Sequence, residues 1–89
     1  MIYAVVQDGL LGNHYTYFHN LENAKKKIDE LKKQFKKVYK YEVKELSEKD
    51  IKMYEWFKYG GFHYKRSYGS LIINNSYDSV YIEEIKTED

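Results

Sequence analysis

The sequence has no cysteine, no proline and no long apolar run. Without cysteine the chain forms neither a disulfide nor a thiolate metal site, which is typical of proteins in the reducing cytoplasm. A membrane-spanning helix needs about 20 consecutive apolar residues, and no segment approaches that length. The first residues also lack the basic start, apolar stretch and cleavage site of a signal peptide. We therefore expect a cytoplasmic protein with no membrane partner.

A strong excess of charge is missing as well, since 15 Lys and Arg residues are balanced by 14 Asp and Glu residues and the net charge is +1. The middle of the chain is basic and its C-terminal end is acidic. A protein that coats DNA depends on many phosphate contacts, so this balance excludes a general DNA-coating role. A local phosphate site is compatible with the balance.

Motifs that carry a reaction are also missing. Glycine-rich phosphate loops of the GxxxxGK[ST] and GxGxxG types do not occur, and no serine sits in a glycine-flanked elbow. Most carboxylates lie in lysine-rich segments that we expect to be exposed, which argues against paired acid–base catalysis. His14 and His19 would point to opposite faces of one strand, so we expect no metal site with Asp8. The sequence therefore predicts a non-catalytic protein without a cofactor.

Aromatic residues are abundant, with eleven tyrosines in 89 residues. A chain of this length forms a single domain, residues 1–89, and buries only about 60–65% of its unfolded surface. Large aromatic side chains therefore have to supply much of the core.

An amphipathic helix over residues 21–38 is the strongest structural signal. Asn20 stands at the N-cap position, and apolar residues follow at spacings of three and four. These apolar residues are Leu21, Ala24, Ile28, Leu31, Phe35 and Val38. The other side carries seven lysines, which Glu22, Asp29 and Glu30 interrupt, and we interpret it as a solvated face.

The remaining segments alternate between strands and one further helix. Runs of β-branched and aromatic residues predict strands at residues 2–7, 15–19, 39–44, 62–68, 70–74 and 79–86. Ser47 and Asp50 form a capping-box pattern that begins a second helix over residues 48–59, and Gly60 and Gly61 end it. Gly69 lies between the segments 62–68 and 70–74, and we count the two as one bent strand. The resulting order β-β-α-β-α-β-β predicts an α+β fold, an antiparallel sheet of about four to five strands with two helices packed on one face. An edge strand is left for pairing with another chain.

Residues 56–69 combine six aromatic rings, one histidine and three cations without a carboxylate. Rings stack on bases or on partner side chains, and cations hold phosphates or carboxylates. The candidate binding residues are therefore Tyr59, His63, Tyr64, Lys65, Arg66 and Tyr68. Alternation along a strand places Tyr64, Arg66 and Tyr68 on one face and His63 and Lys65 on the other. The alternative is that the rings of Phe62, Tyr64 and Tyr68 pack under the helices as core.

The first half of the chain resembles small uncharacterised bacterial and phage proteins. The matching segments are Met1-Ile-Tyr-Ala-Val-Val, residues 20–32 and residues 41–46. They correspond to an opening strand followed by a hairpin, a lysine-rich helix and a closing strand. The resemblance implies a fold for about half of the chain and brings no catalytic or binding residue with it.

Two functions are compatible with these features. The first is a non-catalytic interaction protein, encoded by a phage or mobile element, that binds a host protein through its aromatic surface and a sheet edge. An inhibitor of a defence system is one such protein, and the same edge would also allow a homodimer. The alternative is a binder of nucleotides or single-stranded nucleic acid. In that case Tyr59, Tyr64 or Tyr68 stacks a base while Lys65 and Arg66 hold phosphate.

Overall fold

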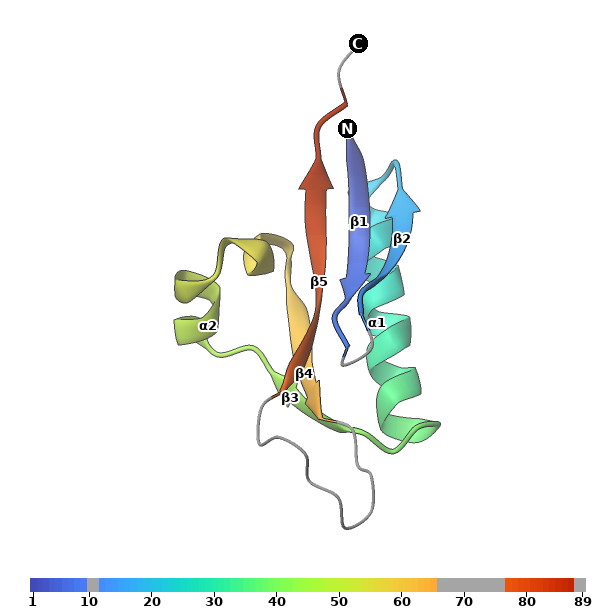
Figure 1. Ribbon diagram of the computed structural model, residues 1–89, viewed down its shortest axis with the longest axis vertical. Helices are drawn as coiled ribbons and strands as arrows, with labels where there is room; N and C mark the ends of the chain where they lie inside the picture. The colour runs from blue at the N-terminus through green and yellow to red at the C-terminus, as the bar shows by residue number, and fades with distance from the viewer. Residues whose placement is uncertain (10–11, 66–76, 88–89) are drawn as a thin grey trace.

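The protein is built around one antiparallel sheet. The computed structural model describes residues 1–9, 12–65 and 77–87. Within these residues, five strands lie in the order β2-β1-β5-β4-β3, and each neighbouring pair is antiparallel (Figure 1). The elements are β1 (Ile2–Gln7), β2 (His14–Phe18), α1 (Leu21–Lys37), β3 (Glu42–Glu45), α2 (Glu48–Met53), the 3-10 helix η1 (Glu55–Tyr59), β4 (Gly61–Lys65) and β5 (Asp78–Ile85). The predicted α+β class, antiparallel sheet and pair of helices are confirmed.

Helix α1 begins at the predicted residue and ends one residue before the predicted end. Asn20 is extended, and its side-chain oxygen accepts a hydrogen bond from the Glu22 amide at 2.7 Å. This bond satisfies one of the amides that have no partner in the first turn of a helix. At the other end, Lys36 and Lys37 lie at the negative pole of the helix dipole.

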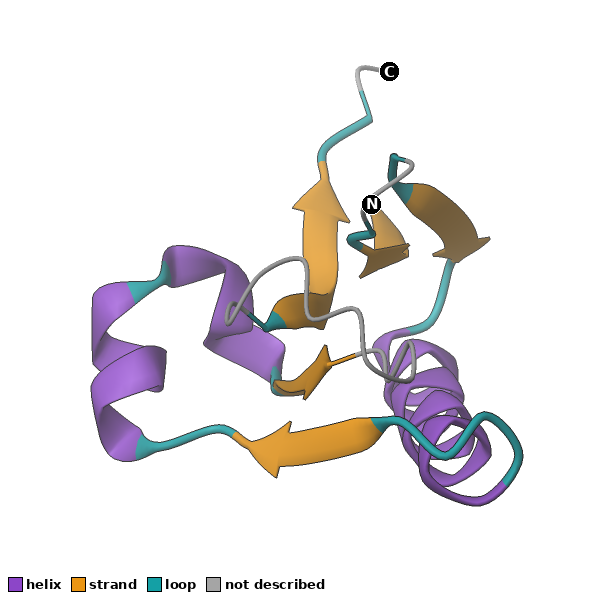
Figure 2. Cartoon of the chain, turned by 60° about the horizontal axis from the view of Figure 1, so that its bottom comes forward, coloured by secondary structure: helices purple, strands orange, loops and turns teal. Residues whose placement is uncertain are grey.

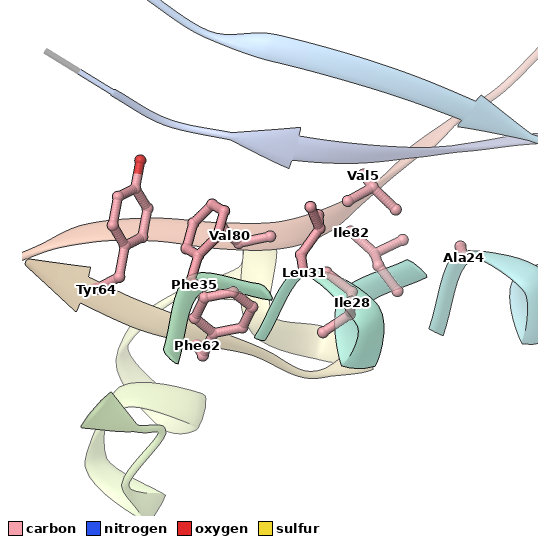
Figure 3. Packing of buried hydrophobic residues seen from close by; sticks show 9 residues of the cluster. All are labelled: Val5, Ala24, Ile28, Leu31, Phe35, Phe62, Tyr64, Val80 and Ile82. Carbon is pink, nitrogen blue, oxygen red and sulfur yellow. The ribbon is translucent and has the colours of Figure 1, made fainter. Parts of the chain in front are cut away.

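The apolar stripe of α1 packs against one face of the sheet (Figure 3). The helix contributes Ala24, Ile28, Leu31 and Phe35 to this cluster, and the strands contribute Val5, Phe62, Tyr64, Val80 and Ile82. Phe35 is the centre of the aromatic packing, with four rings around it at centroid distances of 4.8 to 6.0 Å. The four are Tyr39, Tyr41, Phe62 and Tyr64, and all meet Phe35 edge to face. Such pairs stabilise a core beyond the apolar area that they bury.

The second helical segment packs on the opposite face of the sheet, which corrects the prediction that both helices share one face. Val5 packs in the cluster under α1, whereas its neighbours Ala4 and Val6 belong to a second cluster with Phe57 and Tyr81. Figure 2 shows α1 on one side of β4 and β5, and α2 with η1 on the other. The physical reason is that β1 and β5 carry apolar residues on both faces, because successive side chains of a strand alternate.

The second helix is shorter than the predicted residues 48–59. The capping box is present, since the Asp50 amide donates to Ser47 Oγ at 3.2 Å and the Ser47 amide donates to the Asp50 carboxylate at 3.1 Å. Tyr54 is extended, with φ −119° and ψ 120°, and separates α2 from η1. This break redirects the chain so that Phe57 is buried in the second cluster. Gly60, with φ 96°, ends η1 in a conformation that favours glycine.

Among the described strands, the start of β3 differs most from the prediction, and the other described boundaries lie within one residue of it. Strand β3 begins at Glu42 rather than at residue 39. Lys40 has a φ of 57°, and the Tyr41 amide donates to the Phe35 carbonyl at 2.8 Å, so this segment closes the end of α1 instead of joining the sheet. Strand β4 is described as far as Lys65. Residues 66–68 and the predicted strand at 70–74 lie outside the described residues.

We expect Phe35→Ala to lower the free energy of unfolding by about 3–5 kcal/mol, because it removes a buried ring and leaves a cavity. This is a large share of the roughly 5–15 kcal/mol that stabilises a typical domain. Lys33→Ala, on the exposed side of the same helix, is the control and should change the free energy by less than about 0.5 kcal/mol. Urea unfolding followed by circular dichroism measures both. A loss below about 1 kcal/mol for Phe35→Ala would contradict its central place in the core.

Candidate functional site

The six residues that the sequence proposes as a site do not form one cluster. Tyr64 is 1% exposed, its ring packs on Phe35, and its hydroxyl donates a hydrogen bond to the backbone carbonyl of Asp8. The ring therefore presents no open face on which a base could stack. Arg66 and Tyr68 lie outside the described residues.

Tyr59 lies on the opposite face of the sheet from His63 and Lys65. Lys65 lies opposite Glu42 of β3, and His63 lies on the same face of the sheet as Lys65. Tyr59 instead reaches the α1 side of β5, where its hydroxyl donates to the Glu84 carboxylate at 2.6 Å. The structure therefore divides the three residues between the two faces of the sheet.

His63 connects α2 to β5. Its Nδ1 lies 2.8 Å from the Ser79 hydroxyl, and its Nε2 lies 3.5 Å from the Asp50 carboxylate. Serine, histidine and aspartate are the residue types of a hydrolytic triad, and sequence reasoning did not bring these three together. The Asp50 carboxylate also accepts hydrogen bonds from the amide and the hydroxyl of Ser47, at 3.1 and 2.9 Å, and so caps α2. We interpret the group as a structural connection between α2 and the sheet.

On the face of the sheet that points away from α1, Phe57 of η1 packs with Ala4 and Val6 of β1, whereas β2 beside them carries exposed aromatic rings. Figure 1 shows α2 and η1 on the β5 side of the sheet, away from β2. Tyr15 and Tyr17 are 43% and 60% exposed, and their rings stack at a centroid distance of 6.2 Å. Val6 lies between Tyr15 and Tyr81 in the register of the sheet. The ring of Tyr81 then meets that of Trp56, which is 45% exposed, at 5.4 Å. We call the exposed residues Tyr15, Tyr17 and Trp56, together with the buried Tyr81 between them, the aromatic face.

Carboxylates border the aromatic face. Burial raises the pKa of Asp8, and the negative charges of Asp78 and Glu83 raise it further. Burial also raises the pKa of Tyr81 to about 12, with Asp8 and Glu83 adding to the effect. The charges that contribute to both shifts are negative, so this surface favours a cation and disfavours a phosphate.

An open groove of about 1030 Å³ runs between η1 and β5. Strand β4 pairs with β5 only as far as Gly61 opposite Tyr81. Within the described part of the chain, residues 82–85 therefore have no strand neighbour on that side. The residues that line the groove include Ile51, Met53, Trp56, Tyr59, Ile82 and Glu83. We call it the edge groove, and it adjoins the aromatic face because Trp56 belongs to both.

One carboxylate of the edge groove is already paired. The Tyr59 hydroxyl donates to Glu84 Oε2 at 2.6 Å, and the Lys58 ammonium donates to the same oxygen at 3.3 Å. The hydrogen bond from Tyr59 holds the pKa of Glu84 below its ordinary value, and Lys58 adds to this effect. Glu55 and Glu83 also line the groove, and neither has a cationic partner among the described residues.

Sequence reasoning did not single out Tyr15, Tyr17 or Tyr81, and it assigned Trp56 to the end of a helix. The signal available was the spacing of Tyr15 and Tyr17, since residues two apart lie on one face of a strand. That spacing does not reveal which face of the sheet a helix covers. The exposed face therefore became visible only once both helices were placed.

Comparisons with protein-family models, with curated proteins and with solved structures found no match. No helix in the described part of the chain is long and apolar enough to cross a membrane. Within residues 1–9, 12–65 and 77–87, no group of three or more His, Asp and Glu side chains is placed to hold a metal ion. We therefore infer function from the surface of the molecule.

The Asp50 cap makes stability depend on pH. Hydrogen bonds from the amide and then the hydroxyl of Ser47 hold the pKa of Asp50 below its ordinary value of 3.8. The stabilisation is therefore complete above that ordinary value and is lost as the pH falls through the lowered pKa. We expect Asp50→Asn to lower the urea midpoint at neutral pH, and the difference from wild type to shrink below a pH of about 4.

Asp29→Asn is the matched control, because it removes the same charge from an exposed position of α1. It should leave the urea midpoint at neutral pH unchanged. Equal midpoints for Asp50→Asn and the wild-type protein at neutral pH would show that Asp50 does not stabilise the second helix.

Proposed function

We propose that this is a non-catalytic protein that binds another protein through the aromatic face and the edge groove. The observation that carries the proposal is that the stacked rings of Tyr15 and Tyr17 on β2 and the ring of Trp56 on η1 are exposed on the same side of the sheet, beyond the part that η1 covers. Exposed Tyr and Trp rings are enriched at protein interfaces, where they supply a large contact area at low entropic cost. A connected apolar surface of this kind is typical of an interaction site.

The charges around the aromatic face define the chemistry of the partner. Glu55 and Glu83 have no described cationic partner, and Asp8 already lies among negative charges. A partner surface that combines apolar side chains with Lys or Arg would complement both properties. The phosphates of a nucleic acid would be repelled at the same place. The lysines of α1 lie on the other side of the sheet, away from the exposed rings.

We extend the proposal to the biological setting of the protein. The resemblance of the first half of the chain to small bacterial and phage proteins supports an origin in a phage or mobile element. In that setting the partner is a host protein, and occupation of its surface would inhibit it, as an inhibitor of a defence system does.

Capture of proteins from a lysate of the host cells tests this proposal. We expect the wild-type chain to retain one protein in stoichiometric amount at physiological salt, and the double variant Tyr17→Ala/Trp56→Ala to lose it. Truncation of a central interface ring typically costs about 2 kcal/mol or more, which is roughly a 30-fold loss of affinity. Quantitative mass spectrometry of the eluted protein measures the difference.

The control is Lys26→Ala/Lys33→Ala, which changes two exposed positions on the outer side of α1. It should capture the same protein as wild type, and circular dichroism should show that both double variants are folded. The proposal is wrong if no stoichiometric partner is recovered, or if the control loses the partner to the same extent.

A thermal-shift screen separates this function from the binding of nucleotides or single-stranded nucleic acid. We expect mono-, di- and cyclic nucleotides and short oligonucleotides to leave the melting temperature unchanged at low salt. The reason is that carboxylates border the exposed rings and Tyr64 is buried. A ligand that raises the melting temperature of wild type, but not of Lys65→Ala, would favour the nucleic-acid function.

A further inference from the structure

We propose that the edge groove receives an extended segment of the partner as an additional β-strand along residues 82–85, with a Lys or Arg side chain of that segment beside Glu83. The proposal rests on the proposed function and names the mode of binding and the chemistry of the bound segment. Strand addition to an exposed sheet edge is a recurring way in which proteins bind extended peptides.

The backbone of β5 has hydrogen-bonding groups that point into the edge groove. The Asp8 amide donates to the Ser79 carbonyl at 2.9 Å, so the backbone of Ser79 points toward β1. Backbone groups of successive residues in a strand point to opposite sides. The amide and carbonyl of Glu84 therefore point away from β1, and no described residue hydrogen-bonds to them. A strand placed in the groove would supply the missing partners.

The side chains around this edge suit alternate residues of an added strand. Trp56 and Tyr59 line the groove on the η1 side, and Ile82 lines it on the β5 side. Tyr59 is held in place by its hydrogen bond to Glu84. Successive residues of the added strand would point to the two faces of the sheet, so apolar residues at every second position can contact Trp56 or Tyr59. The side chain of Ile82 is buried under α1 and is not part of this contact.

The charge of Glu83 favours a basic residue at the opposite position of the added strand. Its side chain is exposed and lies on the same face as Ala4, which is its partner in the register with β1. A residue directly opposite Glu83 on the added strand would place its side chain next to this carboxylate. A Lys or Arg there forms a favourable cross-strand pair, whereas an acidic residue is repelled.

The same carboxylates argue against a second copy of this chain as the occupant. Two copies of β5 that pair symmetrically around the middle of residues 82–85 would place either Glu83 opposite Glu83 or Glu84 opposite Glu84. Identical charges directly opposite each other destabilise a strand pair. Charged residues at sheet edges often prevent this kind of self-association. A basic segment from another protein has no such penalty.

Two synthetic peptides of about six residues test the proposal, because this length spans the free part of β5. One alternates lysine with valine, and the other has glutamate in place of each lysine. Nuclear magnetic resonance of the isotope-labelled full chain follows each titration at low salt. We expect the lysine peptide to shift signals of residues 82–85 and η1 and to slow hydrogen exchange of the Glu84 amide. The affinity of the glutamate peptide should be lower by a factor of at least about ten.

A charge reversal makes the test specific. Glu83→Lys changes an exposed residue, and it should reverse the preference so that the glutamate peptide binds better. Glu30→Lys makes the same change of charge at an exposed position of α1 and is the matched control. It should keep the preference of wild type. Equal effects of the two variants would overturn the proposed contact with Glu83.

Two further outcomes would overturn the strand-addition mode. The first is an unchanged exchange rate of the Glu84 amide, both with the lysine peptide and in the complex with a captured partner. If that partner is still lost in Tyr17→Ala/Trp56→Ala, the proposed function holds and only the mode is wrong.

The second outcome that would overturn the mode is a concentration-dependent dimer, seen by analytical ultracentrifugation, that protects the Glu84 amide from exchange. Such a dimer would make a second copy of the chain the occupant of the groove. Binding of the lysine peptide without any captured partner would support the mode while contradicting the proposed function.

Discussion

The structure depends on the position of β5 between β1 and β4. The last strand of the chain pairs with the first over the whole of β1, and on its other side it pairs with β4. It therefore joins the β1–β2 hairpin to the β3–β4 pair in a single sheet. Val80 and Ile82 of β5 supply the cluster under α1, while Tyr81 between them supplies the cluster on the other face. Both clusters would lose their central residues without this strand.

The two pairings of β5 differ in length, and this difference creates the edge groove. Strand β4 begins at Gly61, where any side chain would overlap the backbone oxygen of Val80. The chain before Gly61 leaves the sheet as η1, so β5 continues beyond Tyr81 without a strand beside it. The arrangement that completes the core thus also leaves an open edge and its hydrogen-bonding groups available for a partner.

Tyrosine serves two different purposes in this small domain. Tyr41 and Tyr64 pack on Phe35 and help a short chain to bury enough apolar area. Tyr15 and Tyr17 stack on each other at the surface and shield little besides the neighbouring strand. Residue type alone does not distinguish the two groups, which is why the ring-rich segment 56–69 proved to contain core packing beside the exposed Trp56, while further exposed rings lie on β2.

Elements that depend on contacts within a few residues were predictable before the fold was known. Asn20 and the spacing of apolar residues set α1, the Ser47–Asp50 pair set the start of α2, and Gly60 set the end of η1. Long-range packing, by contrast, sets which face of the sheet each helix covers. It also brings His63 to Ser79 and Asp50 and leaves the rings of β2 exposed. The physical reason is that β1 and β5 come from opposite ends of the chain and carry apolar residues on both faces. Local patterns therefore identify these strands, but they do not say what packs on either side.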